Sequence, residues 1–201
     1  MNIRKSLSLC LVILLLPFLS FGADEYKVDP VHSSVNFKVR HMMVGKVRGQ
    51  FKDFDVTVWG DMADLTKAKV EAVIKVASID TQNSKRDDHL RSEDFFFVEK
   101  FPEITFKSSS VEKKGDGYVL KGTLTMRGVS KQVDIPFEVL GEVKSPKGDV
   151  RIGIEANTKL DRMDYGVKWN RTLDKGGVVV GNEVSVELLL SLISTAKKMK
   201  E

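Results

Sequence analysis

Cysteine and histidine are scarce in this sequence of 201 residues. The single cysteine, Cys10, lies inside an N-terminal apolar run. If that run is removed as a leader, disulfides, thiolate metal sites and cysteine nucleophiles are excluded. His32, His41 and His89 are the three histidines, and no two of them have the spacing that places paired ligands on one helical face. The sequence therefore predicts no metal site and no cofactor, and structural roles for the histidines.

Signals for catalysis and for nucleic-acid binding are also missing. His32 stands beside Ser33 and Ser34, but neighbours along a strand point to opposite faces, and no strained nucleophile turn of the type G-x-S-x-G is present. The charge balance of 32 Lys and Arg against 28 Asp and Glu is only mildly basic. No basic patch with interleaved aromatic residues occurs. We therefore predict no catalytic residues, a protein that is not an enzyme, and no nucleic-acid partner.

The N-terminus has the features of a secretory signal peptide. Arg4 and Lys5 supply positive charge, residues 7–16 form an apolar run, and small residues near 20–23 offer a cleavage site. The run is shorter than the roughly 20 residues that a transmembrane helix needs, although an uncleaved anchor is the alternative. We predict a leader at 1–22 and one domain over 23–201, long enough to bury a core without disulfides.

Alternation of apolar and polar residues recurs along most of the remaining chain, as in Val35, Phe37 and Val39. Turn sequences such as Lys114-Gly115-Asp116-Gly117 separate the alternating runs. The pattern predicts an all-β fold with strands at 34–41, 46–58, 68–79, 103–112, 117–126, 131–141, 148–158 and 178–194. An antiparallel meander of eight strands closes most simply as a barrel. Such a barrel is either filled by side chains or holds one slender ligand, and alternation alone leaves both open.

Residues 80–97 interrupt the alternation with a dense run of charge that ends in three phenylalanines. Asp80 or Thr81 is expected to cap a short helix that continues to about residue 92, between the third and fourth strands. Asp87 and Arg91 have the spacing of a supporting helical pair. The acidic pairs of this helix form either a solvated face or a polar collar. We expect the helix to cover one end of the barrel, with one phenylalanine as its anchor and another bordering the interior.

Six stretches carry a family pattern over nearly all of residues 23–201. They are Asp29-Pro30-Val31-His32-Ser33 with the strand after it, Val47-x-Gly49-x-Phe51, Ser78-Ile79-Asp80-Thr81-x-Asn83 with Arg86-Asp87-x-His89-Leu90-x-Ser92-x-Asp94-Phe95-Phe96, Phe101-Pro102 with Phe106-x-Ser108, Gly122-x-Leu124-Thr125-Met126-Arg127-Gly128-Val129, and Leu160-x-Arg162-x-Asp164-Tyr165-Gly166. Ser130 replaces a common threonine, and Tyr165 a usual phenylalanine. The pattern resembles that of the YceI-like family, the periplasmic polyisoprenoid-binding proteins.

The resemblance implies an extended, lipocalin-like, eight-stranded antiparallel barrel that is hollow, periplasmic and often dimeric. It implies no established catalytic activity. The expected ligand is an isoprenoid, such as a polyprenyl or quinone-like lipid, or a related long-chain lipid, with transient contact to a membrane surface. The expected pore wall consists of Phe37, Val39, Phe51, Ile74, Val76, Phe106, Leu120, Leu124, Ile135, Phe137, Ile154 and Leu188. The expected mouth or head-group residues are Arg40, His41, Arg86, His89, Tyr165 and Trp169.

Energetics favour a reversible carrier or store over an enzyme. Each buried CH₂ contributes about 0.8 kcal/mol relative to water, so several isoprene units would exceed the practical affinity ceiling of about −18 to −21 kcal/mol. The membrane is the relevant reference state, and net affinity then depends on fit and on the head group. Two alternatives remain open, namely a stress-related periplasmic interaction module that uses the barrel as a scaffold, and an enzyme that acts on a buried lipid.

Overall fold

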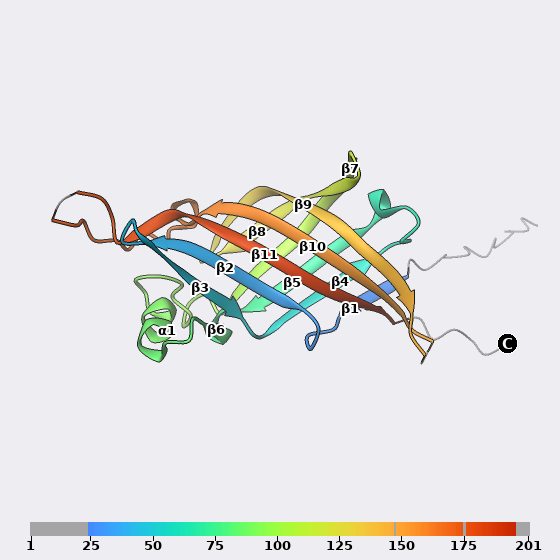
Figure 1. Ribbon diagram of the computed structural model, residues 1–201, viewed down its shortest axis with the longest axis horizontal. Coiled ribbons are helices and arrows are strands. Elements are labelled where there is room, and N and C mark those ends of the chain that lie inside the picture. The colour runs from blue at the N-terminus through green and yellow to red at the C-terminus, as the bar shows by residue number, and fades with distance from the viewer. Residues whose placement is uncertain (1–23, 147, 175, 196–201) are drawn as a thin grey trace, which may run out of the picture.

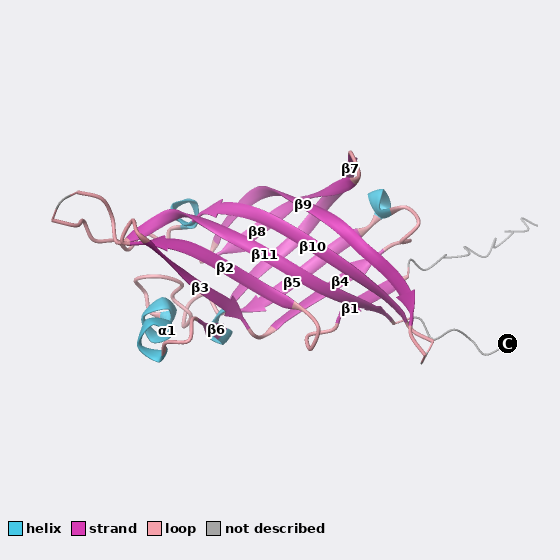
Figure 2. Cartoon of the chain, in the orientation of Figure 1, coloured by secondary structure: helices cyan, strands magenta, loops and turns pink. Residues whose placement is uncertain are grey.

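The computed structural model describes residues 24–146, 148–174 and 176–195, so the predicted leader at 1–22 lies outside the described residues. Strands dominate this part of the chain (Figure 2). The strands are β1 (Glu25–Val28), β2 (Ser34–His41), β3 (Gly45–Phe51), β4 (Phe54–Trp59), β5 (Lys69–Lys75), β6 (Ile79–Asp80), β7 (Glu103–Lys114), β8 (Gly117–Met126), β9 (Val129–Lys144), β10 (Val150–Asp161) and β11 (Val180–Ser194). The helices are α1 (Ser84–Arg91) and the short 3₁₀ segments η1 (Leu65–Lys67), η2 (Val76–Ser78) and η3 (Arg162–Tyr165).

Eight strands close into an antiparallel barrel in the order β1-β4-β5-β7-β8-β9-β10-β11, because β1 pairs with both β4 and β11. The remaining strands extend the wall, with β2 on residues 180–189 of β11, then β3, then β6. The barrel is elongated, and α1 lies at one end beside β3 and β6 (Figure 1). The predicted eight-stranded barrel with one helix between the third and fourth predicted strands is confirmed.

The predicted strand boundaries miss the strand that closes the barrel. Only four residues long, β1 is too short to show alternation, yet Tyr26 lies opposite Val58 on one side and Ser194 on the other. The path from β1 to β2 is broken at Asp29 and Pro30, since proline has no backbone N–H for a ladder. The predicted strand 46–58 is split into β3 and β4, and the predicted strand 68–79 ends in η2.

Two glycines let aromatic rings lie against the barrel wall. A β-carbon added to Gly49 on β3 would lie 2.3 Å from a ring carbon of Phe37, and one added to Gly122 on β8 would lie 2.5 Å from a ring carbon of Phe106. Glycine within a strand commonly marks such a close approach. The glycines of the V-x-G-x-F and G-x-L-T-M sequences therefore make room for the rings of the interior.

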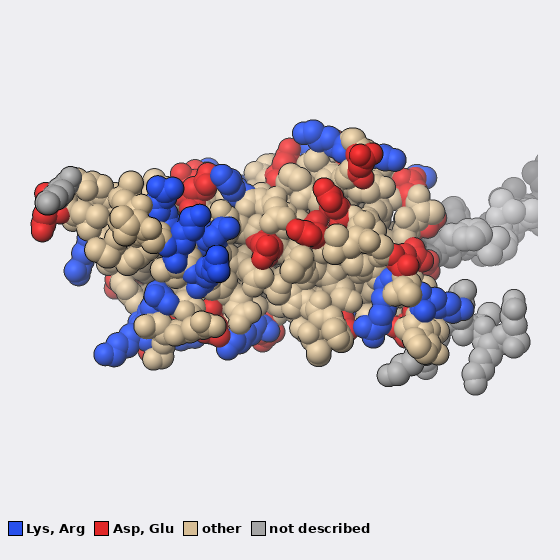
Figure 3. All heavy atoms as spheres, in the orientation of Figure 1, with Lys and Arg blue, Asp and Glu red and all other residues tan. Residues whose placement is uncertain are grey.

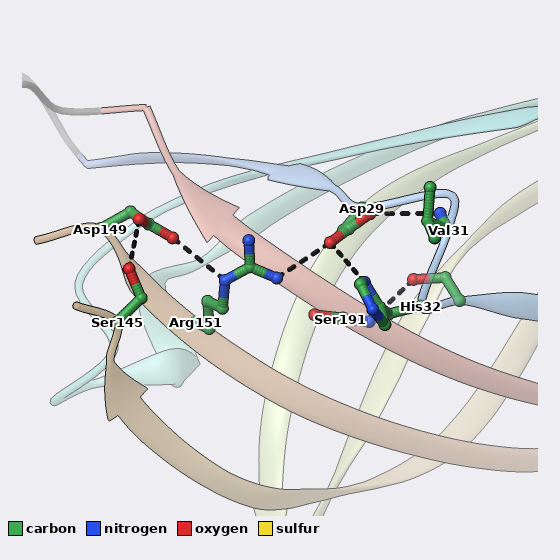
Figure 4. Close-up of polar contacts among 8 residues, drawn as sticks. Asp29, Val31, His32, Ser145, Asp149, Arg151 and Ser191 are labelled. Atoms are coloured by element: carbon green, nitrogen blue, oxygen red, sulfur yellow. Dashed lines mark hydrogen bonds and ion pairs between the residues drawn. The ribbon is translucent and has the colours of Figure 1, made fainter. Parts of the chain in front are cut away.

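A polar network on the barrel joins the bend between β1 and β2 to the turn between β9 and β10 (Figure 4). Arg151 donates to Asp29 Oδ2 (2.9 Å) and to Asp149 Oδ2 (3.1 Å). Asp29 also accepts from His32 Nδ1 (2.8 Å) and from the Val31 N–H (3.1 Å). The hydrogen bond from His32, with the one from Arg151, holds the pKa of Asp29 below its usual value. His32 therefore has a structural role, as the sequence predicts.

Candidate functional site

An apolar cavity of about 200 Å³ lies inside the barrel. Its wall is built by residues from β2, β3, β4, β5, β7, β8, β9, β10 and β11, together with residues between β4 and β5. Asn36 and Thr158 are the polar residues among those described on the wall, and no charged residue lines it. The cavity can therefore accept an apolar chain, but it offers a charged group no partner inside.

Ten of the twelve residues predicted for the pore wall line this cavity: Phe37, Phe51, Ile74, Phe106, Leu120, Leu124, Ile135, Phe137, Ile154 and Leu188. Val39 and Val76 do not. Val39 lies further along β2, between Val47 and Val184, where it is half-buried. Val76 is 1% exposed but belongs to η2, where strand alternation has ended and no longer indicates direction. Contact of the ten wall residues with a ligand stays a prediction.

Several residues of the cavity wall were not predicted from the sequence. Phe54, Val56 and Val58 on β4 alternate like the other strands, so the same pattern within the predicted strand 46–58 could have identified them. Met62 and Leu65 belong to the connection between β4 and β5, where no period is present. Leu65 is buried in the core although its neighbours in η1 are exposed. Only the folded path of this connection places those two side chains at the cavity.

Helix α1 begins later than the sequence predicts. Asn83, not Asp80 or Thr81, is the cap, because its side chain accepts from the Arg86 N–H (3.0 Å). Asp80 instead belongs to β6, where it pairs with Gln50 on β3. The pairing keeps the chain extended past Asp80, and the helix follows only when the strand ends.

The charges of α1 brace the segment itself. Asp87 is 6% exposed and accepts from the N–H (2.9 Å) and the hydroxyl (2.5 Å) of Thr81. Arg86 donates to the same hydroxyl and to the Thr81 carbonyl, each at 2.7 Å. The predicted pair of Asp87 with Arg91 is wrong, since Arg91 pairs with Asp88 (3.0 Å). Of the two alternatives for the acidic residues, the solvated face does not hold for Asp87, because the residue is buried.

An aromatic cluster joins the α1 segment to Trp169, which lies between η3 and β11. The ring centroids of His89, Phe95 and Trp169 lie 5.0 to 5.3 Å apart. His89 Nε2 also donates to Asp94 Oδ2 (2.8 Å). Edge-to-face and tilted ring pairs at this spacing are favourable. His89 and Trp169 therefore hold two segments together, and neither lines the cavity.

The three phenylalanines after α1 have different places. Phe95 belongs to the aromatic cluster. Phe96 packs edge-on against Phe51 of the cavity wall, with centroids 5.9 Å apart, and so anchors the segment to the barrel. Phe97 has a left-handed backbone (φ 53°) and contacts Phe101. Phe96 is thus the one that borders the interior wall.

Arg162 clamps Val167 and Trp169 to the start of β11, and the sequence did not indicate this role. It is 6% exposed and donates to the carbonyls of Val167 (2.5 Å), Gly181 (2.9 Å), Trp169 (3.0 Å) and Val180 (3.3 Å). Burial lowers the pKa of the Arg162 guanidinium. Tyr165, predicted at the mouth, is almost fully buried beside it, and burial raises the pKa of its phenol.

None of the six residues predicted for the mouth lines the cavity. Four of them, Arg86, His89, Tyr165 and Trp169, are described above. The other two, Arg40 and His41, are the last residues of β2. The Arg40 side chain is exposed, and His41 pairs with Gly45 and Val180. A head-group role for any of the six stays a prediction.

No group of three or more His, Cys, Asp or Glu in residues 24–146, 148–174 and 176–195 could hold a metal ion. Over the same ranges, the helices are too short or too polar to span a membrane.

Fold and site together define a closed antiparallel barrel with an apolar interior. The family model of the YceI-like domain matches residues 26–192, and the chain belongs to this family. A UPF0312 protein of Photorhabdus laumondii is 41% identical over 157 residues, which cover 77% of this chain and 82% of that protein.

Two solved structures share the fold. BcnA of Burkholderia cenocepacia superposes with a TM-score of 0.72 at 25% identity, over 82% of this chain and 98% of BcnA. A domain of Saccharophagus degradans, described as polyisoprenoid binding, superposes with a TM-score of 0.62 at 15% identity, over 84% of this chain and 98% of that domain. At that identity the second likeness concerns the fold alone.

Proposed function

We propose that this protein binds the hydrocarbon tail of an isoprenoid, or of a similar long-chain lipid, inside the barrel and carries or stores it in the periplasm. The observation that carries the proposal is an interior cavity whose described wall has no charged residue. Transfer of an apolar chain into such a space is favourable, whereas an unpaired charge there is costly. The ligand's head group is therefore expected outside the cavity.

The size of the cavity favours a slender ligand. Its volume of about 200 Å³ is small beside the roughly 300–1,000 Å³ that is usual for sites of drug-sized molecules. A single hydrocarbon chain fits such a space better than a fused ring system does. Because the tail comes from a bilayer, which is also apolar, uptake is expected to be reversible, which suits a carrier or a store.

The family supports a binding role without a catalytic step. The Saccharophagus degradans domain with the same fold is described as polyisoprenoid binding, and we extend that ligand class to this chain as part of the proposal. The periplasmic location is based on the predicted leader at residues 1–22. A homodimer, which the family resemblance implies, stays a prediction that analytical ultracentrifugation tests.

Native mass spectrometry of protein isolated from the periplasm, followed by extraction and identification of the lipids, tests the proposal. The expected result is a non-covalent adduct with the mass of a prenyl lipid, and uptake of a prenyl quinone by the stripped protein. If no apolar molecule is recovered and the stripped protein takes up no prenyl quinone, the proposal is wrong.

A further inference from the structure

Two loops at one end of the barrel form an exposed apolar tip. The turn between β2 and β3 contains Met42, Met43 and Val44, which are 47%, 50% and 95% exposed. Val178, in the loop before β11, is 37% exposed. Both loops project from the same end, away from the end where β1 and β11 meet (Figure 1). Large apolar side chains at such a turn are unusual, because turns favour small polar residues and glycine.

The two loops form one surface. The Met42 N–H donates to the Val179 carbonyl (2.8 Å). A β-carbon added at Gly177 would lie 3.2 Å from Met43 Cγ, so the second loop packs on the first. Met42, Met43, Val44 and Val178 are called the apolar tip below.

Four cations stand directly behind the apolar tip on β2 and β3. Arg40 lies opposite Lys46, Lys38 lies opposite Arg48, and all four are exposed. None of the four has an ion pair with another described residue. The space-filling view shows Lys and Arg gathered over this end of the barrel (Figure 3). Like charges directly opposite each other destabilise a strand pair, so a negatively charged partner would relieve the repulsion.

We propose that this end of the barrel is a docking surface for an anionic phospholipid bilayer. A bilayer offers both chemistries in the order that the surface requires: phosphates at the level of the four cations, and acyl chains beyond them at the level of the apolar tip. The tip side chains are aliphatic, whereas single-stranded nucleic acid is bound by aromatic stacking. Charge and apolar surface together therefore favour a lipid surface over another polyanion.

Opposing charge is limited near the tip. Among the described residues 171–174 and 176–178, Asp174 is the acid and is exposed, and Arg171 lies over the Trp169 ring. Glu183, at the start of β11, already pairs with Lys159 (2.9 Å). Docking by the tip would bring α1 close to the membrane, since α1 lies at the same end (Figure 1). The inference is independent of which molecule the cavity binds.

Co-sedimentation with sucrose-loaded vesicles tests the proposal, with phosphatidylcholine alone compared with phosphatidylcholine and phosphatidylglycerol at 3:1. Wild type is expected to bind the anionic vesicles in 0.05 M NaCl and to be released in 0.5 M NaCl. Each basic residue near an anionic surface contributes about fivefold in partitioning, so R40Q/K46Q is expected to bind about 25-fold more weakly. For M42S/V44S we expect a loss of about tenfold, from the apolar area that no longer enters the bilayer.

Matched controls come from the opposite end of the barrel. K113Q/K114Q removes two exposed charges at the turn between β7 and β8, and V143S removes an apolar side chain that is 61% exposed on β9. Both controls are expected to bind within about twofold of wild type, because they lie far from the bilayer. All proteins share one N-terminus, so any contribution from residues 1–23 cancels. Urea midpoints establish that each variant is folded.

Three outcomes of the vesicle assay would overturn the proposal. The first is wild type that does not sediment with anionic vesicles at low salt. The second is R40Q/K46Q or M42S/V44S that binds as wild type does, and the third is controls that lose as much binding as the tip variants. Heparin binding without vesicle binding would likewise overturn it in favour of a soluble polyanion. Prenyl-lipid uptake by the tip variants, measured separately, distinguishes failed docking from failed binding in the cavity.

Discussion

Replacing Ala72 by leucine tests whether the barrel is hollow. Ala72 on β5 lines the cavity and lies between Val56 on β4 and Phe106 on β7, both of which also line it. The leucine side chain has three more carbons, and the cavity of about 200 Å³ offers space for them. The substitution therefore adds apolar surface to the interior without displacing a neighbour.

The expected magnitude follows from the three carbons. At about 0.8 kcal/mol for each buried CH₂, Ala72→Leu should stabilise the ligand-free protein by up to about 2 kcal/mol. In a closely packed core the same change would destabilise by about 1–3 kcal/mol. A hollow interior and a closely packed interior thus predict stability changes of opposite sign. Affinity for a prenyl quinone should fall, because the leucine occupies space that the tail requires.

Urea denaturation of lipid-stripped protein measures the stability change, and titration with a prenyl quinone measures the affinity. Val76→Phe is the matched control, since Val76 is buried but does not line the cavity, and its replacement should destabilise by about 1–3 kcal/mol. A destabilisation of stripped Ala72→Leu similar to that of the control would refute the hollow interior. Unchanged quinone affinity would refute the placement of the tail beside β5.

Three further predictions concern polar and aromatic contacts. Arg162→Met should cost about 3 kcal/mol or more in urea denaturation, because buried carbonyls lose a charged donor; a change under about 0.5 kcal/mol, typical of exposed sites, would contradict the clamp. Arg151→Gln should lower stability near neutral pH. The pKa of Asp29 in the folded protein lies below its ordinary value of 3.8. The contribution of the Arg151–Asp29 pair to the free energy of unfolding is therefore present above pH 3.8 and is lost as the pH falls through the pKa of Asp29 in the folded protein. The stabilities of wild type and Arg151→Gln should therefore converge in acid, and a constant gap would contradict the assignment. Phe96→Ala should release a bound apolar dye faster in stopped-flow fluorescence, because its ring packs on the cavity wall. Phe97→Ala is the control, and equal release rates would show that Phe96 does not retain the ligand.

The alternation of apolar and polar residues was sufficient to predict much of the fold and of the cavity wall. Alternation has a period of two, which matches the two faces of a strand, so it identifies inward residues wherever a strand is long and regular. Phe37, Phe106 and Ile135 lie on such strands and line the cavity. Val76 was misplaced because the period ends where η2 begins.

Polar residues of the irregular segments were harder to place. Arg86, His89 and Tyr165 were predicted at a mouth, but Arg86 and His89 brace the α1 segment and Tyr165 is buried in η3. Charge in a sequence does not reveal its partner. Arg86 donates to Thr81 and His89 to Asp94 within their own segment, whereas the ring of His89 also contacts Trp169 of another segment. The role of Arg162 depends on carbonyls up to 19 residues away and had no signal in its neighbours.

The sequence by itself determined an all-β chain with one interrupting helix and an apolar inner face, because these properties depend on local order along the chain. The tertiary structure decided how the barrel closes, since β1 is too short to be recognised until it lies between β4 and β11. It also decided that the interior contains a cavity, because volume depends on how all the walls are spaced. Local pattern selects a face of each strand, and only the closed barrel determines what that face encloses.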